Sequence, residues 1–244
     1  MADALLLLHA FPVDARMWQP QIEALPGIPI VAPNHPGFGA SGDVPDVMTM
    51  ELAARSAMRA LDEAGFDRAV VCGLSMGGYV AFEVWRRFRD RVIGFVLANT
   101  RAGADTQEAA ANRRALAERL RHEGKDFFRD GPPGLLSDGA SDGLRARVRA
   151  MIADQPAEAI AAASLGMAER PDSEGDLGGI DVPTLVITGS KDTLIPSAVT
   201  AEMSERIPGA RLSVIEGAGH LSNLEDPETF TPPLAEHLSR ARLG

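Results

Sequence analysis

The chain is predicted to fold as an α/β domain with a mostly parallel sheet that helices flank on both faces. Apolar runs of four to eight residues alternate along the chain with amphipathic segments of helical length. The apolar runs are nearly continuous, which is typical of parallel strands that are covered on both faces. The alternation of strands and helices indicates right-handed β-α-β crossovers.

The expected elements follow this alternation in order. Residues 4–9 are expected to form a buried strand. This apolar run lacks preceding basic residues and is too short, so a signal peptide and a membrane span are both disfavoured. Further strands are expected at residues 28–32, 69–74, 92–99, 184–188 and 212–215. The segments between and after them are expected to be helices, at residues 15–24, 50–63, 76–88, 197–206 and 227–239.

No strand is expected between residues 101 and 179, where alanine, arginine and glutamate dominate. Asp105 and Glu108 are spaced to cap a helix that ends at Gly124. Two more helices are expected, at residues 144–153 and 157–168. We interpret residues 101–179 as a helical lid inserted into a core made by residues 1–100 and 180–244. Two long crossover connections without a lid function are the alternative.

The composition limits the classes of partner. The 244 residues carry a formal net charge of −10, which disfavours binding to nucleic acid or to an anionic membrane. Cys72 is the single cysteine, so no intrachain disulfide can form. We expect a buried, unreactive Cys72 and a cytoplasmic location. Nothing in the sequence indicates an oligomeric state.

The most informative segment is Gly73-Leu74-Ser75-Met76-Gly77-Gly78. It joins an apolar run to a helix-like run, so the expected geometry is strand, tight turn and helix. The G-x-S-x-G pattern is typical of a nucleophile elbow, where small neighbours let the serine adopt a strained backbone. Ser75 is therefore a candidate nucleophile beside a helix N-terminus, which favours developing negative charge.

A serine hydroxyl is a poor nucleophile without a base and a group that orients the base. Asp192 directly follows the strand at residues 184–188, and open α/β sheets place their sites at the carboxyl ends of strands. His220 follows the strand at residues 212–215 in a glycine-rich loop. We predict that His220 accepts the Ser75 proton and that Asp192 holds the imidazole in the correct tautomer. A turn or helix-capping role is the alternative for Asp192.

The other histidines fit a general base less well. His122 and His237 lie on expected helices, where we expect solvated side chains. His35 lies in a turn, and His9 ends the first strand, where a structural role is commoner.

Acyl transfer also requires donors for the oxyanion of the tetrahedral intermediate. The backbone N–H of Met76, directly after Ser75, is one candidate. The second is expected in the loop after the first strand. We assign it to the backbone N–H of Phe11, because Pro12 has none.

Five motifs in order along nearly the whole chain resemble those of the α/β-hydrolase family, at residues 10–12, 36–41, 73–78, 189–196 and 217–227. The order of Ser75, Asp192 and His220 is also that of this family. Within it, the chain resembles small bacterial carboxylesterases, cofactor-free haloperoxidases and perhydrolases, and 3-oxoadipate enol-lactonases. The resemblance implies the α/β-hydrolase fold and a Ser-His-Asp triad.

Three features depart from the family pattern. The oxyanion loop reads His9-Ala10 where the family has His-Gly, which affects the geometry of that loop. The first two strands of the family fold are not found before residues 4–9. Asn34 and His35 replace the aspartate that usually precedes the turn at residues 36–41.

Residues 37–42 match the G-x-G-x-x-G pattern of dinucleotide-binding sites. Such a site needs a helix to begin at the last glycine, whereas residues 43–46 read as a loop. The five histidines and the single cysteine show no metal-ligand spacing. We therefore expect neither a cofactor nor a metal ion.

These observations predict an enzyme, a serine hydrolase that cleaves a small carboxylic ester through a Ser75 acyl-enzyme. A lactonase or a perhydrolase would use the same attack, and a hydrolase-fold ligand receptor with little turnover is an alternative of another class. The expected partner is a small-molecule ester or lactone. Candidate substrate contacts beside the triad are Leu194 and Leu221. Candidate substrate contacts in the lid are Phe127, Phe128, Leu135, Leu136, Met151 and Ile152. The alternative role for these six residues is to pack the lid on the core.

Overall fold

The computed structural model describes residues 2–129, 131–132, 134–241 and 243. Its strands form one six-stranded parallel sheet in the order β2-β1-β3-β4-β5-β6, which confirms the predicted α/β class. No strand precedes β1 among the described residues. The strands are β1 (Asp3–Leu8), β2 (Ile30–Val31), β3 (Arg68–Leu74), β4 (Val92–Ala98), β5 (Thr184–Gly189) and β6 (Arg211–Ile215).

Helices join the strands in the predicted alternation. The helix expected at residues 15–24 is divided, because Asp14 accepts a hydrogen bond from the Arg16 N–H and starts a 3₁₀ turn. The described 3₁₀ segments are Ala15–Trp18, Arg89–Arg91, Asp126–Phe128 and Glu174–Gly179. The described α-helices are α1 (Gln19–Ala24), α2 (Met50–Glu63), α3 (Met76–Phe88), α4 (Gln107–Glu123), α5 (Asp142–Ala153), α6 (Ala157–Ala168), α7 (Ser197–Glu205), α8 (Ser222–Glu225) and α9 (Pro227–Arg240).

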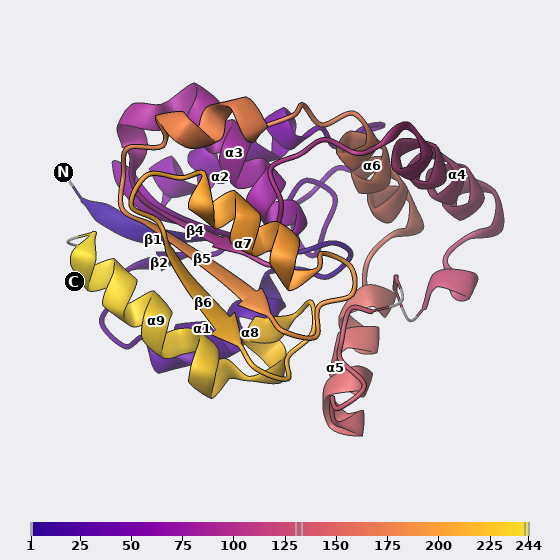
Figure 1. The fold of residues 1–244 in the computed structure, drawn as a ribbon. Coiled ribbons are helices and arrows are strands. Elements are labelled where there is room, and N and C mark those ends of the chain that lie inside the picture. Colours follow the sequence, from indigo (N-terminus) through magenta and orange to yellow (C-terminus); the bar gives the residue numbers. More distant parts are fainter. Residues whose placement is uncertain (1, 130, 133, 242, 244) are drawn as a thin grey trace.

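Both faces of the sheet are covered, as the unbroken apolar strands predict. Alternate residues of a strand point to opposite faces. Leu6 and Leu8 of β1 pack in the cluster that includes α2 and α3, and Leu5 and Leu7 pack in the cluster that includes α9. Figure 1 shows α2 and α3 on one side of the sheet, and α1 and α9 on the other. All four leucines are fully buried, and each burial contributes about 1.5–3 kcal/mol.

Between β4 and β5 the chain forms α4, α5 and α6, the three helices expected for residues 101–179. Figure 1 shows them beyond the end of the sheet toward which the arrows of β5 and β6 point. This is the carboxyl end of the parallel strands. The Ser164 hydroxyl of α6 donates to the Arg113 carbonyl oxygen of α4 at 2.9 Å, which ties these two helices together. The division into core and lid stays a prediction.

The N-terminus of α4 differs from the expectation. Thr106, not Asp105, is the capping residue, and its side chain accepts the Ala109 N–H. The Asp105 carboxylate is 1% exposed and pairs with arginines instead, which are Arg101, Arg113 and Arg170. The expected C-terminus is correct, because Gly124 follows the helix with a φ of 74°.

The expectation of a solvated side chain is correct for His122 and wrong for His237. The His122 side chain is 78% exposed, whereas His237 is 1% exposed. His237 lies one helical turn from Leu234 and beside Leu238, on the buried stripe of α9. Burial lowers the pKa of His237 to about 4, and the charges of Arg211 and Arg240 act in the same direction.

Among the described residues, no helix is both long enough and apolar enough to cross a bilayer. Cys72 is fully buried in β3, and burial raises the pKa of its thiol. A thiol that stays protonated is a weak nucleophile, which agrees with the unreactive side chain expected from the sequence. The cytoplasmic location stays a prediction.

The buried, neutral His237 is expected to make stability depend on pH. The unfolded chain protonates this histidine below about pH 6.5, whereas the folded chain resists protonation down to about pH 4. The free energy of unfolding is therefore highest above the unfolded pKa and falls as the pH drops through this window. In a His237→Gln variant this loss should be smaller by up to about 1.4 kcal/mol per pH unit.

Urea denaturation of both proteins at about pH 7 and about pH 5 measures the difference. His122→Gln is the matched control, because His122 is exposed and should leave the pH dependence unchanged. The same loss of stability in the wild type and in His237→Gln would contradict a histidine that is neutral in the fold.

Candidate active site

Ser75 lies at a tight turn between β3 and α3 with a φ of 56°, a region that residues other than glycine rarely enter. The turn packs too closely on its neighbours to admit side chains. A Cβ atom at Gly73 would lie 2.2 Å from the Gly77 carbonyl oxygen, and one at Gly77 would lie 2.1 Å from the Leu8 carbonyl oxygen. The two glycines of the motif therefore hold the turn against β1, with Ser75 at its tip.

Ser75, His220 and Asp192 lie together, as the sequence predicts. The His220 Nε2 atom is 2.7 Å from the Ser75 Oγ, and the His220 Nδ1 atom is 2.8 Å from the Asp192 Oδ2. A carboxylate only accepts, so the network assigns the proton to Nδ1 and leaves Nε2 to accept the serine proton. The three residues are 9%, 2% and 5% exposed, in the order serine, histidine, aspartate.

The Asp192 carboxylate is fixed by four hydrogen bonds. Its Oδ1 accepts the backbone N–H groups of Leu194 and Ile195, each at 2.9 Å. Its Oδ2 accepts His220 and also the Asn99 side-chain amide at 2.9 Å. Four donors on two oxygens leave the carboxylate one orientation, and that orientation aligns the imidazole. Asp192 therefore acts as a turn acceptor and as the partner of His220 at once.

Asn99 is a site residue that the sequence analysis missed. It directly follows β4 with a φ of 44°, and its side chain also donates to the Gly219 carbonyl oxygen at 3.3 Å and accepts the Ser222 hydroxyl at 2.6 Å. We expected Asn99 to be the last residue of a strand. The signal that could have found it is the one that identified Asp192, a polar residue at the carboxyl end of a buried parallel strand.

The two predicted oxyanion donors are the backbone N–H groups of Met76, the residue after Ser75, and of Phe11, in the loop after β1. Met76 begins α3, so its N–H is one of the first-turn groups that have no partner within the helix. Phe11 lies in the loop after β1 and lines the same cavity as Ser75. Within the described part of the chain, neither N–H donates to a protein atom. Their role toward an oxyanion stays a prediction.

His9 holds the loop after β1 in place. Its Nδ1 atom donates to the Ala10 carbonyl oxygen at 3.0 Å, and its Nε2 atom accepts the His35 N–H at 3.0 Å. Burial lowers the pKa of His9 to about 4, and burial together with His9 lowers the pKa of His35 well below its usual value. Both rings are therefore neutral supports, and His9 has the structural role that its position at the strand end predicts.

A cavity of about 150 Å³ opens onto the Ser75 hydroxyl and the His220 ring. Its volume is about half the lower end of the range for drug-sized ligands, which begins at about 300 Å³. Its lining is mostly apolar and includes two arginines. The lining residues are Phe11, Ser75, Tyr79, Arg101, Arg113, Leu116, Pro132, Met167, Leu194, Ile195 and His220.

Of the predicted substrate contacts, only Leu194 is among the residues that line this cavity. Phe128 packs on Phe11, with ring centroids 6.1 Å apart, and Phe127 lies under the Arg119 guanidinium at 3.7 Å. The remaining contacts lie in the cluster on the α9 side of the sheet or against it, and these are Leu135, Leu136, Met151, Ile152 and Leu221. Leu135 and Leu136 line a separate hollow of about 310 Å³ beside α5.

The two cavity arginines were also missed by the sequence analysis. Arg101 follows β4 and Arg113 lies within α4, and neither belongs to a recognisable motif. No group of three or more histidine, cysteine, aspartate or glutamate side chains in the described ranges is arranged to hold a metal ion. Metal independence stays a prediction.

Comparisons with known proteins cover almost the whole chain. A profile of the Alpha/beta hydrolase family matches residues 5–232. The chain is 30% identical over 236 residues to 3-oxoadipate enol-lactonase 1 of Acinetobacter baylyi. This alignment covers 94% of this chain and 86% of the relative. It is similar to the structure of a thermophilic esterase from Thermogutta terrifontis, with 40% identity, a TM-score of 0.94, and coverage of 99% and 90% of the two chains. An enol-lactonase from Burkholderia xenovorans is similar at 27% identity, a TM-score of 0.87, and 98% and 92% coverage.

The positive φ of Asn99 predicts an inverted order of stability for two substitutions. Alanine is normally more stable than glycine by about 0.5–1 kcal/mol, but a Cβ atom is penalised by about 1–2 kcal/mol in the left-handed region. Asn99→Gly should therefore be more stable than Asn99→Ala, by up to about 1 kcal/mol, although both lose the bond to Asp192.

Denaturant unfolding of the two variants measures the difference. Ala115→Gly, on the exposed face of α4, is the control in which glycine should be the less stable residue. A more stable Asn99→Ala variant would show that the backbone at this position carries no strain.

Proposed function

Because the chain belongs to the alpha/beta hydrolase family, we propose that it is a carboxylic ester hydrolase that works through an acyl-enzyme on Ser75. The observation that carries the proposal is the unbroken path of hydrogen bonds from the Ser75 Oγ through His220 to Asp192, with distances of 2.7 and 2.8 Å. A nucleophile, a base and an orienting acid within hydrogen-bond reach are the parts that acyl transfer needs. The similarity to an esterase supports the same reaction class.

In the proposed first half-reaction, the Ser75 Oγ attacks the carbonyl carbon of the ester while its proton moves to the His220 Nε2. The carbonyl oxygen becomes an oxyanion, toward which the N–H groups of Met76 and Phe11 would donate. Collapse of this intermediate breaks the bond to the alcohol, which leaves with the proton from His220. Asp192 stays ionised and stabilises the transient imidazolium.

In the second half-reaction, a water molecule gives a proton to His220 and its oxygen attacks the carbonyl carbon of the acyl-enzyme. The intermediate then expels the Ser75 oxygen, which recovers the proton from His220. The net change is ester and water to carboxylic acid and alcohol. The same path is used twice, so the loss of any member of the triad should affect both halves.

The proposal includes a lid role for residues 101–179. Four of the residues that line the Ser75 cavity come from within this segment, away from its ends, namely Arg113, Leu116, Pro132 and Met167. They close the cavity to about 150 Å³, which favours an ester with compact acyl and alcohol groups. Exclusion of water by such a wall strengthens the electrostatic interactions inside.

Lactone hydrolysis is the second candidate, because two of the similar proteins are enol-lactonases. A lactone is an ester whose alcohol stays tethered to the acyl group, so the same attack by Ser75 opens the ring. Rates of hydrolysis for linear esters and for ring esters of matched size separate the two candidates. The ester proposal fails if kcat/KM is measurable for the lactones alone.

Ser75→Ala is expected to abolish turnover, by about 10⁶-fold in kcat, because no nucleophile remains. The fold should be unchanged, since alanine is smaller than serine and adds no contact. Steady-state rates on an activated ester and a thermal melt of the same sample test both statements. Ser41→Ala, outside the triad, is the matched control. More than a few per cent of residual activity in pure Ser75→Ala protein would rule out Ser75 as the nucleophile.

Asp192→Asn is expected to lower kcat on the order of 10⁴-fold, because an amide presents the wrong hydrogen-bonding pattern to His220 Nδ1. Asp181→Asn is the control, since the Asp181 side chain is 68% exposed and pairs with Arg89 on the surface. The measurement is kcat on a saturating activated ester. A nearly silent Asp192→Asn substitution would mean that another group orients the imidazole.

A further inference from the structure

The wall of the Ser75 cavity carries positive charge in a chain of net charge −10. Arg101 follows β4 and Arg113 lies one turn and a half into α4, and both line the cavity. Their side chains are 33% and 24% exposed, so each guanidinium is only partly used by the protein. The two arginines therefore place positive charge at the Ser75 cavity of a negatively charged protein.

The charges around this wall do not balance. Three arginines form ion pairs with the Asp105 carboxylate. The distances are 2.8 Å from Arg101 Nη2, 2.5 Å from Arg113 Nε and 2.8 Å from Arg170 Nη1. Burial raises the pKa of Asp105, but the charges of Arg113 and Arg170 outweigh it and keep the carboxyl ionised. Three positive charges on one negative charge leave an excess of two.

Arg170 alone meets the structural need of Asp105. Its side chain is 2% exposed, and it donates to the carbonyl oxygens of Met167 and Gly103, each at 2.9 Å, while its guanidinium lies 4.1 Å from the Tyr79 ring centroid. A buried carboxylate needs one such partner. Arg101 and Arg113 are therefore additional cations, whose mutual repulsion costs stability unless an anion joins them.

Both arginines keep donors for a further acceptor. Arg101 pairs with Asp105 through its Nη2 and Arg113 through its Nε. The Arg101 Nη1 and the Arg113 Nη1 and Nη2 have no acceptor among the described residues. Arg101 also borders a neighbouring hollow that contains Glu174 and Glu202, where Glu174 pairs with Arg206 at 2.9 Å. Arg113 is therefore the main cation of the Ser75 cavity, and Arg101 is the second.

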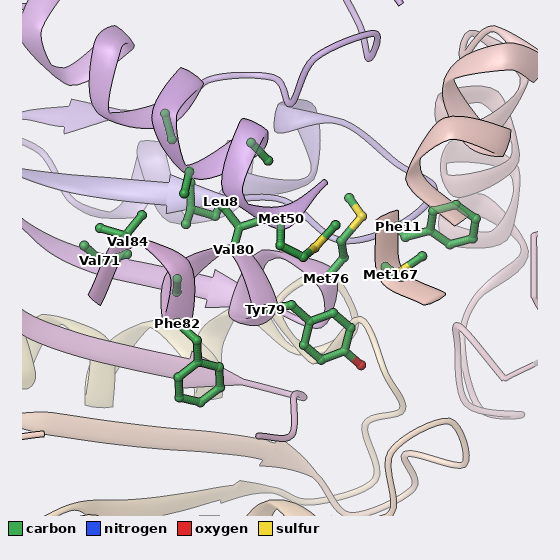
Figure 2. Close-up of a cluster of buried hydrophobic side chains, with 14 of the residues drawn as sticks. Leu8, Phe11, Met50, Val71, Met76, Tyr79, Val80, Phe82, Val84 and Met167 are labelled. Atoms are coloured by element: carbon green, nitrogen blue, oxygen red, sulfur yellow. The ribbon is translucent and has the colours of Figure 1, made fainter. Parts of the chain in front are cut away.

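Apart from Ser75, His220 and the two arginines, the lining is apolar or aromatic. Figure 2 shows three of these residues, Phe11, Met167 and Tyr79, toward one end of the buried cluster. A ligand in this space therefore meets both carbon surface and the two arginine side chains. Guanidinium is planar and matches a carboxylate with two parallel hydrogen bonds.

We propose that the Ser75 cavity selects esters or lactones that carry a free carboxylate, which Arg113 and Arg101 bind while Ser75 attacks the ester carbonyl; this rests on the proposed function. The carboxylate neutralises one of the two excess positive charges and is not itself changed in the reaction. It lies on either the acyl or the alcohol part of the substrate, and the two arms of the experiment distinguish these positions.

The experiment compares esters that differ only in charge. Monoethyl succinate carries a carboxylate on the acyl side, and ethyl succinamate is its neutral counterpart. Acetoxyacetate carries a carboxylate on the alcohol side, and acetoxyacetamide is its neutral counterpart. Wild-type kcat/KM should favour the anion in one pair by about 10–100-fold, the range for a hydrogen bond to a charged group. Added salt should reduce the preference.

Arg113→Gln and Arg101→Gln should each reduce the ratio of kcat/KM for the anionic ester to kcat/KM for its neutral counterpart, mainly by raising KM for the anion. Arg113→Lys keeps the charge without the paired donors and should retain part of the preference. Arg114→Gln, next along α4 and exposed, is the matched control. Thermal melts identify any variant that is unfolded, and Arg113→Lys remains informative if Arg113→Gln does not fold.

Hydrolysis of the neutral esters with no preference for an anion in either pair would overturn the carboxylate proposal and leave the proposed function standing. Binding measurements distinguish the carboxylate proposal from the proposed function further. Calorimetric titration of the Ser75→Ala protein should show tighter binding of the preferred anion than of its neutral counterpart. That result in a chain whose wild type hydrolyses none of the four esters would support the arginine site and count against the ester hydrolase. Equal binding of anion and neutral ester would overturn the site.

Discussion

The close packing of the Ser75 turn against the strands beside it is the constraint on which the rest of the site depends. The turn stays in its strained conformation because the Ser75 N–H donates to the Ala98 carbonyl oxygen at 2.9 Å and the Ser75 carbonyl oxygen accepts the Thr100 hydroxyl at 2.9 Å. Strain of this kind persists only where the surroundings fix it from several sides. The end of β4 therefore supports Ser75. The same short segment continues into Asn99, which binds Asp192, and Arg101, which lines the cavity.

The helices beyond the sheet are tied to the core by buried polar groups. Gln155, between α5 and α6, is fully buried, and its amide donates to Asp14 at 2.7 Å and accepts the Gly39 N–H at 2.8 Å. The Leu221 N–H, next to His220, donates to the Leu135 carbonyl oxygen at 3.0 Å. Buried polar groups that lose their partners are costly. Separation of these helices from the core would therefore leave several donors and acceptors unpaired, including one beside His220.

The elements that the sequence predicts well are those whose signals are local. Apolar runs identify the strands, and the spacing around Ser75 identifies the turn, because close backbone contact admits only glycine there. Asp192 and His220 follow strands directly, so the parallel sheet alone brings them near Ser75. Arg113 and Asn99 could not be found in this way. Their roles depend on pairings between segments far apart in the chain, such as Arg113 with Asp105. The predicted exposure of His237 is also wrong, because its helical spacing places this polar residue on the buried stripe of α9.

If the chain hydrolyses esters as proposed, the arginines of the cavity have a consequence for product release. Hydrolysis of any carboxylic ester creates a carboxylate at the position that the ester carbonyl occupied, so even a neutral substrate would yield an anionic product in the cavity that Arg113 and Arg101 line. Departure of the acid then requires the separation of opposite charges in a space of about 150 Å³. Accumulating acid would compete with fresh ester for the same guanidinium groups. In such a site, product inhibition would follow from the same arginines that are proposed to bind the substrate.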